Sequence, residues 1–304
     1  MKKYLVLALK GMGMGAADVV PGVSGGTIAF ITGIYEELIN SIKSINHKTL
    51  KLLFTGKLAA FWKAVNANFL LALVIGIGIS VVSLAKILKY ILENHPELIW
   101  SFFFGLIVAS AIYVAKQIKT WNVSTVISLV AGVAVAYWIT EISPAETTNA
   151  YWFIFVSGAI AICAMILPGI SGSFILLLLG KYESIIGAIS DFKLLVLGVF
   201  LSGAAVGIIS FSNVLSWLLK KFHNQTIAVL AGFMVGSLNK VWPWKNTLES
   251  ITDRHGELKP ILQENVLPHT YEGDSHLLSA ILLAIAGFVL IFVIERLAIK
   301  KELV

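Results

Sequence analysis

Charged residues are scarce in this sequence. Asp, Glu, Lys and Arg together make up 13% of the 304 residues, about half of the roughly 25% found in soluble domains. Hydrophobic residues make up 58%, and the mean hydropathy is +0.87. This composition excludes an ordinary soluble globular protein and predicts a polytopic membrane protein. The net charge of +6 does not indicate nucleic-acid binding, because the basic residues flank apolar runs rather than lining an aromatic-rich face.

Cysteine and arginine are also scarce, and histidine is absent from the apolar runs. Cys163 is the only cysteine, so no internal disulfide can form. Arg254 and Arg296 are the only arginines, and neither lies within an apolar run, which excludes a buried arginine clamp for an anion. The six histidines fall in loops or at the ends of apolar runs, so no general base is expected beside a serine at membrane depth. With no Cys/His cluster, Walker loop or dinucleotide fingerprint, the sequence predicts no enzyme, no metal and no cofactor.

Long uncharged runs are what the sequence has in place of these features. Each is long enough, or nearly so, to cross roughly 30 Å of hydrocarbon as a helix. The runs are 64–85, 98–115, 121–140, 194–219, 277–294 and the slightly shorter 224–239. A further run of 34 residues, from Thr147 to Gly180 (180 − 147 + 1), would measure about 51 Å as a helix. One straight span cannot use that length, so this run is expected to fold back at Pro168-Gly169.

One motif occurs twice. Asp18-Val-Val-Pro21-Gly22-Val-Ser24-Gly25-Gly26-Thr27 is matched, 147 residues later (168 − 21), by Met165-Ile-Leu-Pro168-Gly169-Ile-Ser171-Gly172-Ser173. Each copy is followed by a glycine and then Tyr-Glu, at 33–36 and 180–183. Proline and glycine break a helix where water cannot satisfy the backbone. Each motif segment therefore predicts a helical hairpin, re-entrant or fully crossing, with the Pro-Gly-x-Ser-Gly loop at its tip.

The repetition extends over both halves of the chain. Residues 76–110 match 203–237 at a shift of 127 (203 − 76), so the first half holds about 20 extra residues. We predict a first repeat over 1–145, with a basic amphipathic insertion at 46–66 that is either a surface helix or a plain loop. The second repeat covers 146–304 and carries an outer loop at 241–276. Each half has an odd number of crossings, so the halves are expected to be inverted.

The predicted fold class is therefore an all-α polytopic membrane protein with an inverted-topology repeat. Each half is a Pro/Gly-broken, re-entrant helical hairpin plus three spanning helices. The basic residues gather at the loops that share a side with both termini, so the positive-inside rule places both termini in the cytoplasm. The basic start imitates a secretory signal, but its apolar core is only Tyr4 to Leu9, and we expect it to be retained.

The repeated loops are the candidate binding site. A helix that restarts at Gly-x-Ser-Gly offers free backbone N–H groups to an anion such as phosphate, and hydroxyls add further donors. The candidate phosphate-binding residues are Ser24, Gly25, Gly26, Thr27, Ser171, Gly172 and Ser173. The candidate helix breaks or hinges are Pro21, Gly22, Pro168 and Gly169. The alternative is that the small residues serve close helix packing.

Three acidic residues lie near these loops. An ionisable side chain at membrane depth is a candidate carrier of a coupling proton or sodium ion. The three are Asp18, Glu36 and Glu183. Asp18 has a second interpretation, as a cap for the half-helix that follows Pro21. Glu36 and Glu183 have one too, because Tyr35 and Tyr182 before them are typical of the membrane interface.

The two motifs, Gly15 to Tyr35 and Leu167 to Ser173, closely resemble those of the polyprenyl-phosphate translocase (PopT-type) family, formerly a bacterial membrane family of unknown function. The resemblance covers nearly the whole chain. It implies recycling of undecaprenyl phosphate from the outer to the inner leaflet of the bacterial cytoplasmic membrane, which supplies the lipid carrier for cell-envelope polymers. Under this resemblance Asp18, Ser24, Gly25, Gly26 and Thr27 match the first family motif, and Ser171, Gly172 and Ser173 match the second.

The resulting hypothesis is a flippase that binds the phosphate of a polyprenyl-phosphate lipid between the loops while the tails stay among membrane lipids. The halves would alternate access by rocking. One rival is an ion-coupled secondary transporter of a small soluble anion. In that case free phosphate would compete with the transported anion for the site. Another is an enzyme acting on lipid phosphates, which would release a cleaved product. The oligomeric state is open, because one chain carries both loops.

Overall fold

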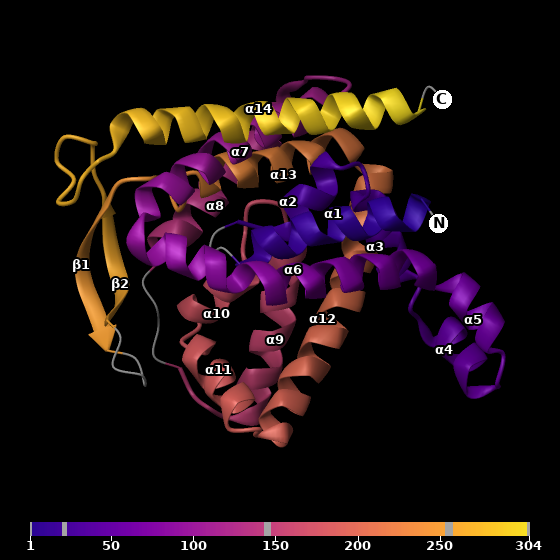
Figure 1. Ribbon diagram of the computed structural model, residues 1–304. Coiled ribbons are helices and arrows are strands. Elements are labelled where there is room, and N and C mark those ends of the chain that lie inside the picture. The colour runs from indigo at the N-terminus through magenta and orange to yellow at the C-terminus, as the bar shows by residue number, and fades with distance from the viewer. Residues whose placement is uncertain (1, 20–22, 143–146, 253–257, 303–304) are drawn as a thin grey trace.

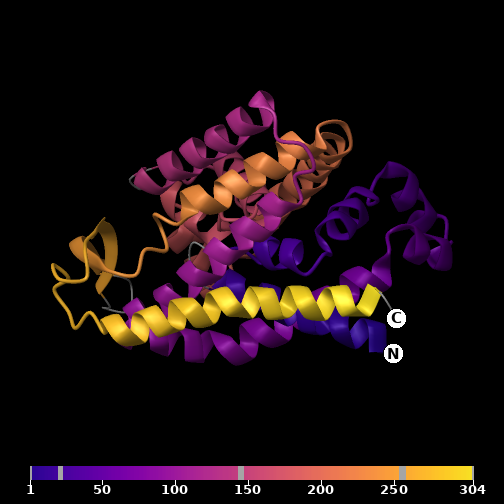
Figure 2. The same ribbon diagram turned by 90° about the horizontal axis from the view of Figure 1, so that it is seen from above.

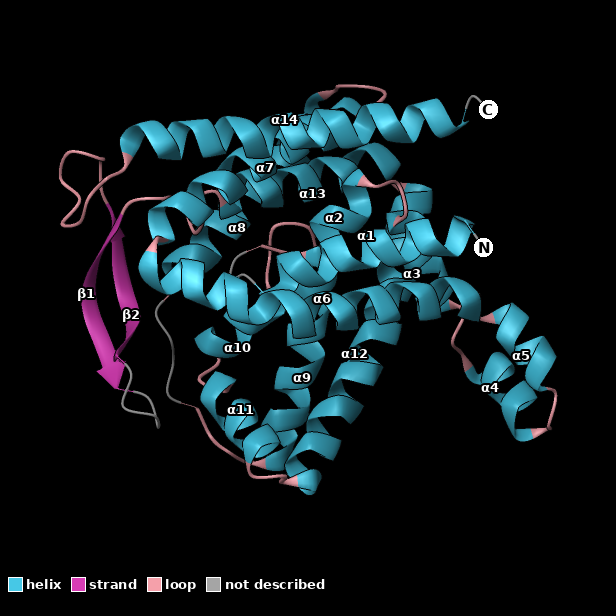
Figure 3. Cartoon of the chain, in the orientation of Figure 1, coloured by secondary structure: helices cyan, strands magenta, loops and turns pink. Residues whose placement is uncertain are grey.

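The computed structural model describes residues 2–19, 23–142, 147–252 and 258–302. The chain is mostly helical (Figure 3). The first half contains α1 (Lys2–Val19), α2 (Gly25–Ile31), α3 (Tyr35–Lys43), α4 (His47–Phe54), α5 (Leu58–Ala64), α6 (Ala67–Asn94), α7 (Pro96–Lys116) and α8 (Val123–Glu141). The second half contains α9 (Tyr151–Ile166), α10 (Gly172–Leu178), α11 (Tyr182–Ser190), α12 (Leu194–Lys221), α13 (His223–Ser237), β1 (Lys245–Thr252), β2 (Leu258–Asn265) and α14 (Leu277–Glu302).

Several of these helices are suited to a membrane. Among the described residues, α7, α8 and α12 are long and apolar enough to cross a bilayer. The number of candidate spans rises to five if each of two bent helix pairs counts as one span. The fold is therefore that of a multi-pass membrane protein, as the hydropathy predicts.

The sequence repeat is also a repeat of structural elements. The bounds of α10 and α11 follow those of α2 and α3 by 147 residues (172 − 25 and 182 − 35). Those of α12 follow α6 by 127 residues (194 − 67), and α13 starts 127 residues after α7 (223 − 96). Equivalent sequence thus forms equivalent helices. The inverted orientation of the two halves stays a prediction.

Equivalent glycines lie at equivalent helix contacts. α1 packs along α6 in the first half, and α9 packs along α12 in the second. A Cβ added to Gly76 would lie 2.0 Å from the carbonyl oxygen of Ala8, and one added to Gly203 would lie 1.9 Å from that of Phe155. Only glycine permits such close backbone approach, which explains why this residue recurs at a shift of 127.

The last helix of each half packs on the other half. α8 lies along α13, and α14 lies along α7 (Figures 1 and 2). Gly105 and Gly232 mark these crossings, because their added Cβ atoms would lie 1.8 Å from the carbonyl oxygen of Ala284 and 2.3 Å from that of Leu129. α7 and α13 also contact each other. The two halves therefore interlock through swapped helices rather than meeting at one flat interface.

The outer loop predicted at 241–276 contains a β-hairpin. β1 and β2 pair antiparallel from Lys245↔Asn265 to Thr252↔Leu258, with an irregularity near Glu249. The sequence pattern does not reveal these strands, because KNTLESIT and LKPILQEN are largely polar and neither alternates regularly between polar and apolar residues.

The insertion predicted at 46–66 differs from a single amphipathic helix. It forms two short helices, α4 and α5, because Gly56 between them has φ +73°, a left-handed conformation that ends α4. Most of the apolar side chains of α4 and α5 are exposed, with Phe54 85% accessible.

The two ends of the molecule carry different elements. The start of α1, the end of α14 and the α4–α5 pair lie at one end in both views, and the β-hairpin lies at the other (Figures 1 and 2). This arrangement separates the basic insertion from the outer loop, as the charge pattern predicts.

Candidate functional site

The second motif breaks the helix where the sequence predicts. α9 ends at Ile166 and α10 starts at Gly172, with Pro168 and Gly169 between them. Gly169 has φ +87°, a conformation that favours glycine. After α10 the chain turns at Gly180, and α10 and α11 meet at 113°. The helix of this segment is broken at Pro168-Gly169 and α10 packs back on α9, as the sequence predicts. Pro21 and Gly22 of the first motif lie outside the described residues.

The two motif loops contact each other. The Ser24 hydroxyl donates to the carbonyl oxygen of Met165 at 2.9 Å, and its oxygen accepts from the Gly26 N–H at 3.0 Å. The Thr27 hydroxyl oxygen accepts from the N–H of Gly169 at 3.2 Å. The Ser24–Met165 and Thr27–Gly169 bonds join positions 141 and 142 residues apart, so the structure brings together the two copies of the motif.

In the described part of the first loop, the N–H groups of Gly25 and Gly26 are bonded to protein side chains. An oxygen of Asp18 accepts from the N–H of Gly25 at 2.7 Å, which is the capping role that its position before Pro21 also predicts. Ser24 and Thr27 are 0% and 1% exposed. A Cβ added to Gly26 would lie 2.3 Å from the carbonyl oxygen of Ile166. The glycines here permit loop-to-loop packing, and the binding role of this loop stays a prediction.

The second loop borders a pocket. Ser171 lies at its wall, and its hydroxyl is 2.8 Å from that of Ser173, while Gly172 is buried and faces the carbonyl oxygen of Ala161 on α9. α8, α10 and α13 supply the other walls. The lining residues are Ala136, Ile139, Thr140, Gly169, Ile170, Ser171, Phe174, Ser237 and Lys240.

Lys240 is the lining residue that sequence reasoning misses. Its Nζ lies 4.7 Å from the centroid of the Phe174 ring. Burial lowers the pKa of the Lys240 amine, and the charge of Glu141 opposes that shift. In sequence, Lys240 is one of many basic residues that end an apolar run, so nothing distinguishes it from an ordinary flanking charge. Only the packing of α13 against α8, and of the Gly169 loop against Met234 of α13, places this cation beside a motif serine.

The three candidate carboxylates do not gather at one place. Asp18 alone contacts a motif loop. Glu36 is exposed, with its Oε1 3.5 Å from Nε2 of His223, and Glu183 is exposed as well. The exposure of both glutamates agrees with the interface interpretation of Tyr35-Glu36 and Tyr182-Glu183.

Comparison with known proteins decides the family. A family model described as undecaprenyl phosphate translocase-like matches residues 14–259, which include both motif loops, the pocket and β1. This chain belongs to the undecaprenyl phosphate translocase-like family. No solved structure matches the chain.

Two curated relatives of this translocase-like chain carry the same descriptive name. A polyprenyl-phosphate transporter of Vibrio cholerae serotype O1 is 47% identical over 301 residues, covering 98% of each chain. A polyprenyl-phosphate transporter of Staphylococcus aureus is 35% identical over 256 residues, covering 77% of this chain and 85% of the relative. The resemblance seen in the motifs is thus confirmed at the level of the family.

Proposed function

We propose that this chain is a flippase for undecaprenyl phosphate. It takes the lipid from the outer leaflet of the bacterial cytoplasmic membrane and delivers it to the inner leaflet, where the carrier is reused for envelope polymers. Membership of the translocase-like family and the printed names of both relatives support a polyprenyl-phosphate lipid as the substrate class. Both termini lie in the cytoplasm in this proposal, so the β-hairpin end faces outward.

The observation that carries the proposal is the pocket between the second motif loop and Lys240. It combines the Ser171 hydroxyl, a loop that contains Gly169 and a half-buried cation. A lysine charge and hydroxyl donors together suit a phosphate monoester, and a charge-assisted bond is stronger in a site that excludes water. Apolar walls from Ile139 and Phe174 leave the lipid tail free to remain in the bilayer.

Asp18 has a defined place in this proposal. Its carboxylate already accepts the N–H of Gly25 in the first loop, whereas the second loop borders the pocket, so in this proposal a lipid phosphate contacts the second loop first. Delivery to the other side then requires the Ser24–Met165 and Thr27–Gly169 bonds to rearrange as the halves rock. A proton or sodium ion on Asp18 is the proposed route for coupling, because neutralising this carboxylate weakens its hold on the loop.

The test is lipid translocation by the purified chain in liposomes that contain a short-chain fluorescent polyprenyl phosphate. We expect the wild type to move the lipid and Lys240→Met to be slower by roughly 10-fold or more, because a hydrogen bond to a charged group contributes about 1.5–3 kcal/mol. Lys240→Arg retains the charge and should keep most of the rate. Lys193→Met, which removes an exposed lysine paired with Asp191, is the matched control.

The same assay separates the rivals. A soluble-anion transporter would be inhibited by free phosphate and would ignore tail length, whereas a lipid flippase would depend on the tail. An enzyme would alter the mass of the recovered lipid. Translocation no faster than in empty vesicles would refute the proposal.

A further inference from the structure

Three side chains that ligate metals in proteins converge at the β-hairpin end of the molecule. His95 lies in the link between α6 and α7, Glu97 in the first turn of α7, and His276 directly before α14. One ligand atom from each lies within 4.8 Å of the others. Nε2 of His276 is 3.9 Å from Oε1 of Glu97. These groups are separate from the pocket residues, and the translocation proposal does not use them.

Glu97 is a buried carboxylate that lies close to His276 without a hydrogen bond to it. The Glu97 side chain is only 5% exposed, although burial of a carboxylate is unfavourable unless its charge is compensated. Its separation from His276 is too long for a hydrogen bond. A cation between the two side chains would bridge Nε2 of His276 and Oε1 of Glu97 through one coordination bond to each. It would also compensate the charge of the buried carboxylate.

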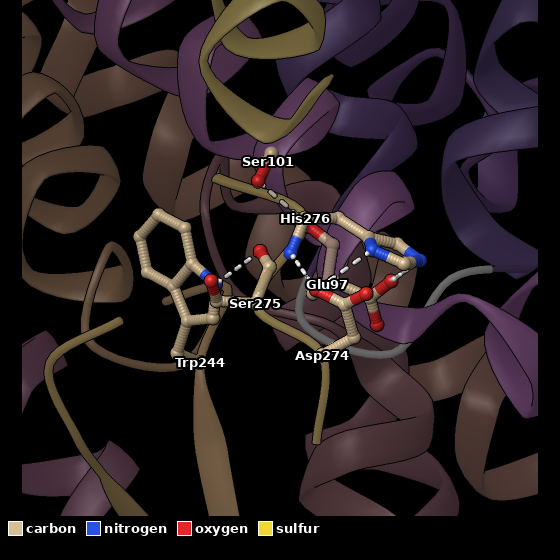
Figure 4. Close-up of polar contacts among 6 residues, drawn as sticks. All are labelled: Glu97, Ser101, Trp244, Asp274, Ser275 and His276. Atoms are coloured by element: carbon tan, nitrogen blue, oxygen red, sulfur yellow. Dashed lines mark hydrogen bonds and ion pairs between the residues drawn. The ribbon is translucent and has the colours of Figure 1, made fainter. Parts of the chain in front are cut away.

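Asp274 orients His276 toward Glu97. Its Oδ1 lies 3.1 Å from Nδ1 of His276 and also accepts the backbone N–H of His276 at 3.0 Å. A proton on Nδ1 leaves Nε2, the nitrogen that faces Glu97, with its lone pair free. Figure 4 shows the Asp274 and Glu97 carboxylates beside the imidazole, with dashed lines to its two nitrogens. A carboxylate on the far nitrogen of a histidine is the usual outer partner of a metal-bound imidazole.

The surrounding backbone fixes these ligands. The carbonyl oxygen of Ser275 accepts from the indole N–H of Trp244 at 2.9 Å, which ties the segment to the base of the β-hairpin (Figure 4). The Ser101 hydroxyl donates to the backbone carbonyl oxygen of Glu97 at 2.7 Å. His276 itself has φ +40°, a conformation that side chains rarely adopt. The cluster is therefore built into the junction of α7, the hairpin and α14.

We propose that His95, Glu97 and His276 form a binding site for a divalent transition metal of the zinc class. Two imidazoles and one carboxylate suit Zn²⁺, Co²⁺ or Ni²⁺ better than Mg²⁺ or Ca²⁺, which prefer oxygen ligands alone. Three protein ligands leave a fourth position for water in tetrahedral geometry. His95 is exposed, so its ring can rotate to bring its nitrogen within the roughly 2.0–2.1 Å that a Zn–N bond requires. The metal would fasten the α6–α7 link to the start of α14.

The experiment is Zn²⁺ binding to the full-length chain, purified in detergent without a polyhistidine tag and stripped with a chelator. We expect one Zn²⁺ per chain, a higher unfolding temperature with the metal, and a visible absorption band when Co²⁺ replaces Zn²⁺. His95→Ala should remove the high-affinity site. Asp274→Asn, which alters only the outer partner, should weaken it by roughly 10–100-fold.

Two other histidines serve as matched controls. His269 lies in the same loop as His276, between β2 and α14, and His223 is the partner of Glu36. Neither His269→Ala nor His223→Ala should change the Zn²⁺ stoichiometry or affinity. His276→Ala tests the second imidazole, with gel filtration to show that this variant is folded. The proposal is overturned if the wild type binds no Zn²⁺, or if folded His95→Ala and His276→Ala both bind it as tightly as the wild type. Loss of binding in the His269 variant would also count against the assigned ligands.

Discussion

Asp18 and Met165 occupy matching positions in the two motifs but act differently on the loops that follow them. The Asp18 carboxylate accepts the N–H of Gly25, whereas Met165 contributes only its backbone oxygen, to the hydroxyl of Ser24. The difference between Asp18 and Met165 therefore means that the N–H of Gly25 in the first loop is already bonded to a carboxylate of the protein. The second loop has no such carboxylate at the equivalent position and borders the pocket.

Lys245 shows how the surroundings alter a basic residue near this pocket. Its Nζ donates to the carbonyl oxygen of Lys240 and lies 4.5 Å from the centroid of the Trp100 ring. Burial, followed by the positive charge of Lys240, lowers the pKa of Lys245 from 10.5 to about 7. The folded protein therefore binds fewer protons than the unfolded chain between about pH 7 and 10.5, and the free energy of unfolding gains from this residue as pH rises through that window.

This shift predicts a pH-dependent effect of Lys245→Met. Below pH 7 the folded wild type carries a buried charge that the variant lacks. We expect the unfolding temperature of the variant, relative to wild type, to be higher at pH 7 than at pH 10 by roughly 3 °C or more. The measurement is thermal unfolding in detergent at both pH values, with exposed Lys193→Met as the control. An identical difference at both pH values would contradict the lowered pKa.

At the scale of elements, the two motif loops have different surroundings: the first is bonded to α9, and the second borders the pocket. Ser24 caps α2, and its hydroxyl donates to the carbonyl oxygen of Met165 in α9. This hydroxyl therefore holds the two hairpins together. Ser171 lines the pocket, and its hydroxyl contacts Ser173. Equivalent serines in the sequence therefore have different surroundings in the fold.

The serines give a paired prediction. Ser24→Ala should lower the free energy of unfolding by about 1–3 kcal/mol, because it leaves a buried N–H of α2 without its cap. Ser171→Ala should leave stability nearly unchanged and reduce binding of a polyprenyl phosphate several-fold. Thermal unfolding and lipid binding, measured on both variants, check the two effects. A Ser171→Ala variant with normal lipid affinity would show that the pocket is not the phosphate site.

Some of these elements can be predicted from local sequence and others cannot. The helix break at Pro168-Gly169 and the long apolar helices α7, α8 and α12 follow from hydropathy and from the conformations of proline and glycine, which act within a few residues. The β-hairpin and the α4–α5 turn at Gly56 were not predicted. Both fall outside the long uncharged runs of the sequence, where hydropathy contrasts are weak and side-chain packing decides the secondary structure.

At the scale of the whole molecule, the basic insertion and the β-hairpin lie at opposite ends (Figure 1). This gives a direct test of orientation. In a Cys163→Ser background, Thr247→Cys in β1 should react with a membrane-impermeant maleimide added to intact cells. Lys57→Cys, in the turn between α4 and α5, should react only after the membrane is opened. Reaction of both sites from the same side would refute the proposed topology.

The sequence by itself determined the membrane class, the repeated hairpin motif, the helix breaks and the family, because each depends on composition or on contiguous residues. The tertiary structure decided which motif loop is closed and which borders a pocket. It also placed Lys240 beside Ser171, and brought His95 and Glu97 to His276 across 181 positions (276 − 95). These groups meet only because α7, α13 and α14 pack across the two halves of the chain. Such contacts depend on helix crossings that local hydropathy and residue spacing do not specify.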